Sequence, residues 1–173
     1  HLIEIFPRRG AIVSEMSAQQ VRALFDTCSL LLGQIVQRIA ETWRHHEIEQ
    51  LQKLMEQIEA EYRQGHTEKF YDLIFQTLAQ QQDMVANLYL MKFYQELLPS
   101  LRRSYFLTLN TSRRELQESF DLFKLVIDAI LIRKSQQASL FMDDFCRHLR
   151  NLVLESLTRM KQIELAWARR SRR

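Results

Sequence analysis

The segment SAQQVRALFDTCSLLLGQIVQRI, residues 17–39, determines the fold class of this chain. Ser17 and Gln20 have the spacing of a capping box, in which each side chain bonds the backbone N–H of the other residue, so a helix is predicted to begin here. The apolar residues that follow recur every three or four positions, which is the spacing of one buried helix face. They are Val21, Leu24, Phe25, Cys28, Leu31, Leu32, Ile35, Val36 and Ile39.

The same periodicity continues to the C-terminus in five further segments. Only three glycines and two prolines occur among the 173 residues, too few turn formers for a β-sandwich or a Rossmann-type sheet. We therefore predict an all-α fold, an antiparallel bundle of six to seven helices. The predicted helix boundaries are Gly65, Thr67, Pro99 (a kink or break within residues 84–109), Ser112 and Ser135.

Residues 1–16 have a different pattern from the rest of the chain. Two β-type runs flank the turn-forming stretch Pro7–Gly10, so the pattern predicts a short β-hairpin with Arg8 and Arg9 at its tip. A lone hairpin is marginal in water, which indicates the remnant of another domain. We divide the chain into this hairpin, a helical domain over residues 17–168 and a basic tail over residues 169–173.

The charge distribution locates any nucleic-acid contact at the hairpin end. The net charge is +3, but six of the 24 basic residues lie at the two ends of the chain, and without these six the chain has 18 basic against 21 acidic residues. Cys28 and Cys146 lie inside apolar patterns and make no paired framework, as expected for reduced thiols. The chain lacks both a signal-peptide pattern and an apolar run of about 18 residues, so we expect a cytoplasmic protein without membrane contact.

Motifs for catalysis are weak. Three scattered glycines cannot form a phosphate-binding loop, and no nucleophile elbow surrounds a serine, so we predict that the chain is not an enzyme. Candidate metal ligands are sparse: Asp72 and Gln76 lie one helical turn apart, and His148 lies one turn after Asp144.

An aromatic and basic segment gives the strongest binding signal. Arg102 and Arg103 stand beside Tyr105 in the middle of the chain, where the two guanidinium groups could clamp the carboxylate of a ligand. They could equally lie on an exposed face with the aromatic residues packed beneath them.

A hairpin followed by a six-helix bundle resembles the C-terminal part of the GntR family of bacterial transcription regulators, in the FadR-like branch. There a winged helix-turn-helix ends in a wing hairpin and an all-helical FCD domain follows. The resemblance is carried by the order and spacing of short segments along nearly the whole chain: Arg8–Val13, Val21–Asp26, Arg38–Ala40, Gln64–Phe70, Asp72 to Gln76, Ile127–Ile130 and Ala138 to Met142.

The resemblance implies a homodimer whose helical domain binds a small metabolite, often an organic acid, and changes the affinity for operator DNA. Many members hold a divalent metal with one aspartate and three histidines. Here Asp72 persists, but Gln76, Phe123 and Phe145 occupy the three histidine positions. The arginine and glutamate usual in the first helix are replaced by Cys28 and Leu32. Only Asp72 then remains as a ligand, unless His148, one turn after Phe145, substitutes. Because a zinc or nickel site needs three or four protein ligands, we expect no bound metal and an apolar pocket, suited to an acyl or aromatic acid.

Our main hypothesis is the effector-binding and dimerisation domain of a GntR-type regulator. The effector-binding residues would be Asp72, Gln76, Arg102, Arg103, Tyr105 and His148, and the DNA-binding residues Arg8 and Arg9. The alternative is a helical protein–protein interaction module without a small-molecule ligand. A metalloenzyme of the four-helix type is the third hypothesis, and it requires ligands in place of Gln76, Phe123 and Phe145.

Overall fold

The computed structural model describes residues 3–6, 10–13, 16–108 and 112–170, which form two strands and seven helices. β1 (Ile3–Phe6) pairs antiparallel with β2 (Gly10–Val13), with Ile3 opposite Val13. The predicted all-α bundle is confirmed. Its helices are α1 (Ala18–Thr42), α2 (His45–Gln64), α3 (Thr67–Ala79), α4 (Gln82–Val85), α5 (Leu88–Phe106), α6 (Arg113–Leu131) and α7 (Ser135–Arg170).

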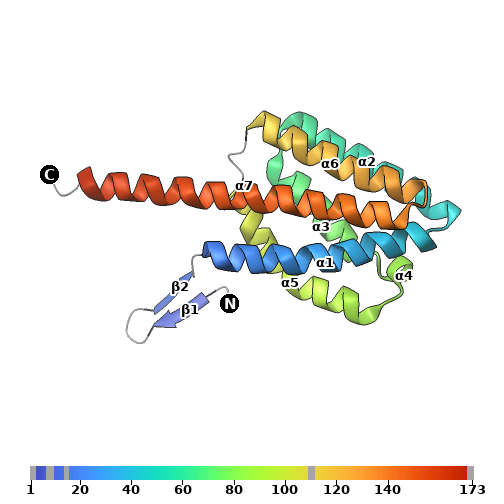
Figure 1. Cartoon of the computed structure of the whole chain (residues 1–173), viewed down its shortest axis with the longest axis horizontal. Coiled ribbons are helices and arrows are strands. Elements are labelled where there is room, and N and C mark those ends of the chain that lie inside the picture. The colour runs from blue at the N-terminus through green and yellow to red at the C-terminus, as the bar shows by residue number, and fades with distance from the viewer. Residues whose placement is uncertain (1–2, 7–9, 14–15, 109–111, 171–173) are drawn as a thin grey trace.

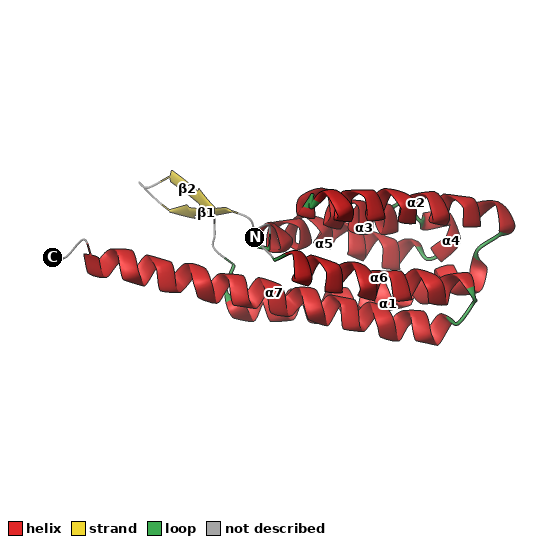
Figure 2. Ribbon diagram, turned by 90° about the horizontal axis from the view of Figure 1, so that it is seen from above, coloured by secondary structure: helices red, strands yellow, loops and turns green. Residues whose placement is uncertain are grey.

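Helices α1 and α7 form the long axis of the molecule, and α6 lies along α7 (Figures 1 and 2). Helices α2 and α3 complete the bundle on the side of α6, and α5 packs against α1 and α3. The last turns of α7 extend past the bundle at the end from which the hairpin projects. No helix in the described ranges has the length and hydropathy of a membrane span.

Three helix boundaries follow the predicted local chemistry. Ser17 caps α1 and Ser112 caps α6, each in a complete capping box. Gly65 ends α2 with φ of 75°, a left-handed conformation that glycine adopts without a steric penalty. Thr67 differs from the prediction, because it is the first residue of α3 and His66 holds the cap position.

The predicted helix over residues 84–109 is divided at a different point. α5 begins after Asn87, whose side chain accepts a hydrogen bond from the backbone N–H of Leu90 at 3.0 Å. Ala86 has a positive φ of 50° and separates this cap from α4. Pro99, where we expected a kink or a break, lies inside α5, which is continuous through it. A single proline removes only one intrahelical hydrogen bond, and the buried face of α5 continues on both sides of it.

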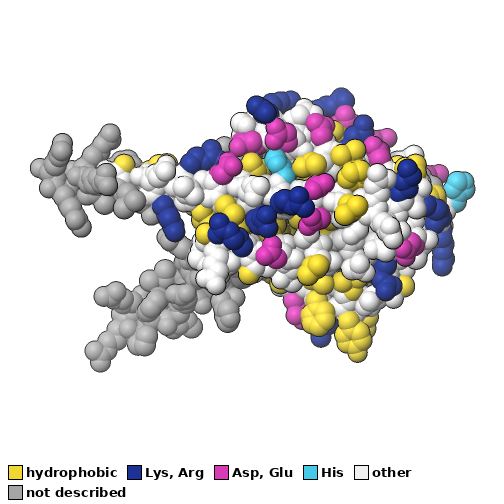
Figure 3. Space-filling model, in the orientation of Figure 1, with side chains coloured by type: hydrophobic (Ala, Val, Ile, Leu, Met, Phe, Trp, Pro, Cys, Tyr) yellow, Lys and Arg dark blue, Asp and Glu magenta, His cyan; other side chains and the backbone are white. Residues whose placement is uncertain are grey.

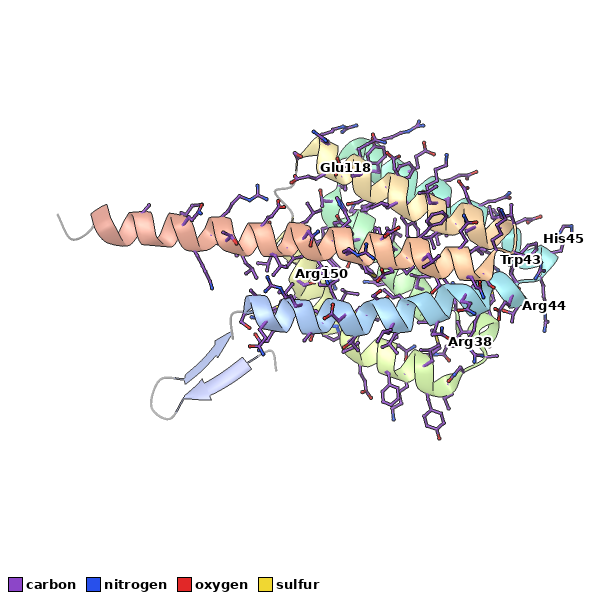
Figure 4. All side chains as sticks on the ribbon, viewed as in Figure 1. Arg38, Trp43, Arg44, His45, Glu118 and Arg150 are labelled. Atoms are coloured by element: carbon purple, nitrogen blue, oxygen red, sulfur yellow. The ribbon has the colours of Figure 1, made fainter. Side chains whose placement is uncertain are left out.

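Close packing holds α1 against α7. A Cβ atom on Gly33 would lie 2.8 Å from Oγ of Ser139, so glycine permits this approach of the two helices. The guanidinium of Arg150 on α7 pairs with Asp26 on α1 at 3.0 Å (Figure 4). α7 also continues as helix through Arg170, two residues into the segment predicted to be a basic tail.

Candidate functional site

An aromatic cluster fills the place where α3, α5, α6 and α7 meet. It consists of Tyr71 and Phe75 from α3, Tyr105 from α5, Phe123 from α6 and Phe145 from α7, all at most 2% exposed. Neighbouring ring centroids lie 5.5–6.0 Å apart along the path from Tyr71 to Phe123. Such a cluster excludes water, so polar groups at its edge interact in a medium of low dielectric constant.

The first polar group at this edge is centred on Asp72. Its carboxylate accepts hydrogen bonds from the hydroxyl of Tyr105 and from the guanidinium of Arg102, the latter at 3.0 Å. Arg102 also lies 3.5 Å from the carboxylate of Glu68. Burial, followed by the hydrogen bond to Asp72, raises the pKa of Tyr105 far above its ordinary value, so the phenol stays protonated and donates.

The second polar group joins three helices through one hydroxyl. Oγ of Ser119 on α6 lies 2.9 Å from the hydroxyl of Tyr71 on α3 and 3.0 Å from Nε2 of His148 on α7. The same Oγ donates to the backbone carbonyl of Glu115 at 3.0 Å. Because a hydroxyl donates only once, this arrangement assigns Tyr71 and the Nε2–H of His148 as donors to Ser119. Burial raises the pKa of Tyr71 to about 12, consistent with that role.

These two groups are adjacent, and they contain most of the residues that the sequence singled out. Tyr71 immediately precedes Asp72 in α3, and its ring packs against that of Tyr105. The structure therefore brings Asp72, Arg102 and Tyr105 into direct contact and places His148 in the neighbouring group.

Gln76 and Arg103 are not part of either group. Gln76 is exposed on α3, whereas Arg103 is half-buried on α5. No hydrogen bond or ion pair between described residues joins Arg103 to Asp72. Of the two arginines predicted to clamp the carboxylate of a ligand, only Arg102 lies in the first polar group. The carboxylates next to it belong to Asp72 and Glu68 of the chain itself.

Sequence reasoning missed Tyr71 and Ser119. A signal for Ser119 is present, because it interrupts the apolar face formed by Leu116, Phe120 and Phe123 and is fully buried. A hydroxyl in the middle of such a face needs a partner from another helix or from its own backbone. Tyr71 carries no comparable signal, since a tyrosine on an apolar face is common in any helical core.

The interior residues do not fit a metal ion. A structural or catalytic zinc site uses three or four nitrogen, oxygen or sulfur ligands. Phe123 and Phe145, at two of the positions where the resemblance implies histidine, are fully buried and pack against each other at 5.5 Å. No group of three His, Cys, Asp or Glu side chains gathers anywhere in the described part of the chain.

The fold and this site define an all-helical domain with polar side chains at the edge of an aromatic interior. The chain belongs to the FCD domain family, whose model matches residues 23–151. No curated protein sequence matches it.

Several solved structures share the fold. E. coli McbR/YncC is 14% identical with a TM-score of 0.78, over 89% of this chain and 77% of that one. The structure named Streptococcus agalactiae GntR is 16% identical with a TM-score of 0.64, over 87% and 74% of the two chains.

Proposed function

We propose that the chain is the effector-binding and dimerisation domain of a GntR-type bacterial transcription regulator. Membership of the FCD domain family supports this, and so does the fold shared with a protein named GntR. We further propose that the domain acts without catalysis and in the cytoplasm. Arg8 and Arg9, which lie outside the described residues, would contact the phosphates of operator DNA.

The observation that carries the effector proposal is the pair of polar groups at the edge of the aromatic cluster. Tyr71 and His148 supply hydrogen-bond donors positioned by the hydroxyl of Ser119, and the neighbouring aromatic rings supply an apolar wall. This chemistry suits a small organic or acyl acid whose carboxylate meets His148 and whose apolar part lies among the rings. Asp72, Tyr105 and Arg102 would form the opposite rim, with Gln76 and Arg103 at its outer edge. We propose no metal in the site.

The proposed mechanism is a shift between two packings of the bundle. Each polar group joins more than one helix: α3 with α5 through Asp72, and α3 with α6 and α7 through Ser119. A ligand that replaces one of these hydrogen bonds stabilises a different placement of the helices. In the complete regulator, that placement would set the spacing of the DNA-binding parts over two half-sites.

A panel of small organic and acyl acids, measured by thermal shift and then by calorimetry, tests the proposal. We expect one acid class to stabilise the natural chain, and Ser119→Ala to weaken that ligand at least about tenfold, because Ser119 no longer holds the side chains of Tyr71 and His148 in place for the carboxylate. Thr158→Ala removes an exposed hydroxyl from α7 and serves as the matched control, with unchanged affinity.

A ligand that binds Ser119→Ala as tightly as it binds the natural chain would contradict this site. No response to any acid would favour the alternative, a helical module that recognises a protein partner.

A further inference from the structure

The outer face of α5 carries large apolar side chains in contact with solvent. Leu88 is 72% exposed, Tyr89 73% and Phe93 56%. Tyr89 and Phe93 lie one helical turn apart and therefore on the same side of α5. Figure 3 shows hydrophobic side chains gathered at the edge of the molecule that Figure 1 assigns to the first half of α5. Apolar patches of this kind on a folded domain mark interaction surfaces.

The opposite face of α5 is fixed in the core, so this exposure cannot be relieved by turning the helix. Met91, Tyr94 and Leu101 are buried. The hydroxyl of Tyr94 donates to the backbone carbonyl of Phe75 at 2.9 Å, which sets the rotation of α5 relative to α3. Tyr89 and Phe93 consequently remain on the outside in the isolated chain.

Two charges flank the apolar residues with opposite signs. Lys92 and Glu96 are both exposed, one turn apart, on the same side of α5 as Phe93. Neither makes an ion pair with another residue of the described chain. When two α5 helices run antiparallel about a two-fold axis passing close to Phe93, Lys92 of each copy lies near Glu96 of the other. The pattern is thus complementary to itself in both charge and hydrophobicity.

We propose that the outer face of α5 is where a second copy of this chain binds, with Tyr89 and Phe93 at the centre and two reciprocal Lys92–Glu96 pairs at the rim. This inference rests on the proposed dimerisation and names the surface that performs it. An isologous contact of this type buries the apolar side chains of both copies and satisfies both charges at once.

Sedimentation velocity over a range of protein concentrations tests the surface. We expect Lys92→Glu and Glu96→Lys each to weaken the dimer at least about tenfold, because each brings like charges together twice per dimer. The double variant K92E/E96K restores opposite charges, so its dissociation constant returns to within about twofold of the natural value. Lys124→Glu on α6 makes the same change of charge at an exposed site and leaves the dimer unchanged.

A second variant tests the apolar centre without reference to charge. Phe93→Ser removes a ring that is 56% exposed, so the fold is retained and only association weakens. If Lys92→Glu and Phe93→Ser both leave the dissociation constant unchanged, this surface is wrong, although dimerisation itself stands. A natural chain that is monomeric at every concentration overturns both this inference and the dimerisation in the proposed function.

Discussion

A single buried hydroxyl, that of Ser119, joins α3, α6 and α7 through Tyr71, its own backbone and His148. Replacing it with alanine leaves the buried hydroxyl of Tyr71 and the half-buried imidazole of His148 without this acceptor, at a cost of about 1–3 kcal/mol of folding free energy. Binding experiments on Ser119→Ala are therefore best made well below its unfolding temperature. A loss of ligand affinity in a variant that is fully folded then reports on the site and not on stability.

The carboxylate of Asp143 makes the fold sensitive to acid. The hydroxyl of Ser29 on α1 donates to it, and this hydrogen bond, with that from Arg147, holds the pKa of Asp143 below its ordinary value. A carboxyl group whose pKa is lower in the folded state stabilises the fold above its unfolded pKa of about 3.8. That stabilisation is lost as the pH falls through the lower, folded value.

Asp143→Asn is accordingly expected to destabilise the chain at pH 7 by roughly one hydrogen bond, about 1 kcal/mol. Urea unfolding at pH 7 and at pH 3 measures this difference, which should shrink at the lower pH. Asp83→Asn, at an exposed position on α4, is the control and should change neither value. A difference that stays constant between the two pH values would show that the ionised form of Asp143 is not what stabilises the contact.

Among the helices, α7 has a bundle part and a projecting part. Leu157 is the last of its buried residues in the core, and Arg159–Ile163 are all exposed in the region where α7 leaves the bundle (Figures 1 and 2). Removal of residues 159–173 is therefore expected to change the free energy of unfolding by less than about 1 kcal/mol. Urea unfolding followed by circular dichroism measures this value, while the helical signal per molecule decreases. A loss of stability above about 2 kcal/mol would show that the projecting part is packed in solution.

Helix boundaries could be predicted from the sequence where neighbouring residues determine them. The capping boxes at Ser17 and Ser112 and the glycine at the end of α2 act through neighbouring backbone groups, so short segments suffice to recognise them. The division between α4 and α5 was not accessible, because it depends on a left-handed Ala86, a conformation that alanine adopts only when tertiary packing imposes it.

The residues of the candidate site could be predicted from the sequence only in part, for a similar reason. Asp72 and Gln76 are one turn apart, but an α-helix advances by 400° over four residues, so Gln76 is rotated by 40° and faces solvent. Contacts between helices, such as that of Tyr71 with Ser119, depend on which helices become neighbours. Periodicity identifies the buried face of each helix, but it does not identify the helix that covers that face.

At the scale of the whole molecule, the two cysteines report whether α1 and α7 separate. Cys28 on α1 and Cys146 on α7 are both free and buried in the core. Burial raises the pKa of Cys28 to about 12 and that of Cys146 well above its ordinary value, so reactive thiolate is scarce in the folded chain. Labelling of either thiol therefore requires the helices to open.

We expect both thiols to be labelled together at pH 8, at least about a thousandfold more slowly than in the unfolded chain, since opening is as rare as global unfolding. Mass spectrometry of the two peptides measures each rate without any substitution. Fast labelling of Cys28 with continued protection of Cys146 would contradict this expectation. It would mean that the environment of Cys28 opens while the rest of the core stays closed. An effector bound among α3, α5, α6 and α7 could then act on α1 through that opening, and the labelling rate of Cys28 would change with its concentration.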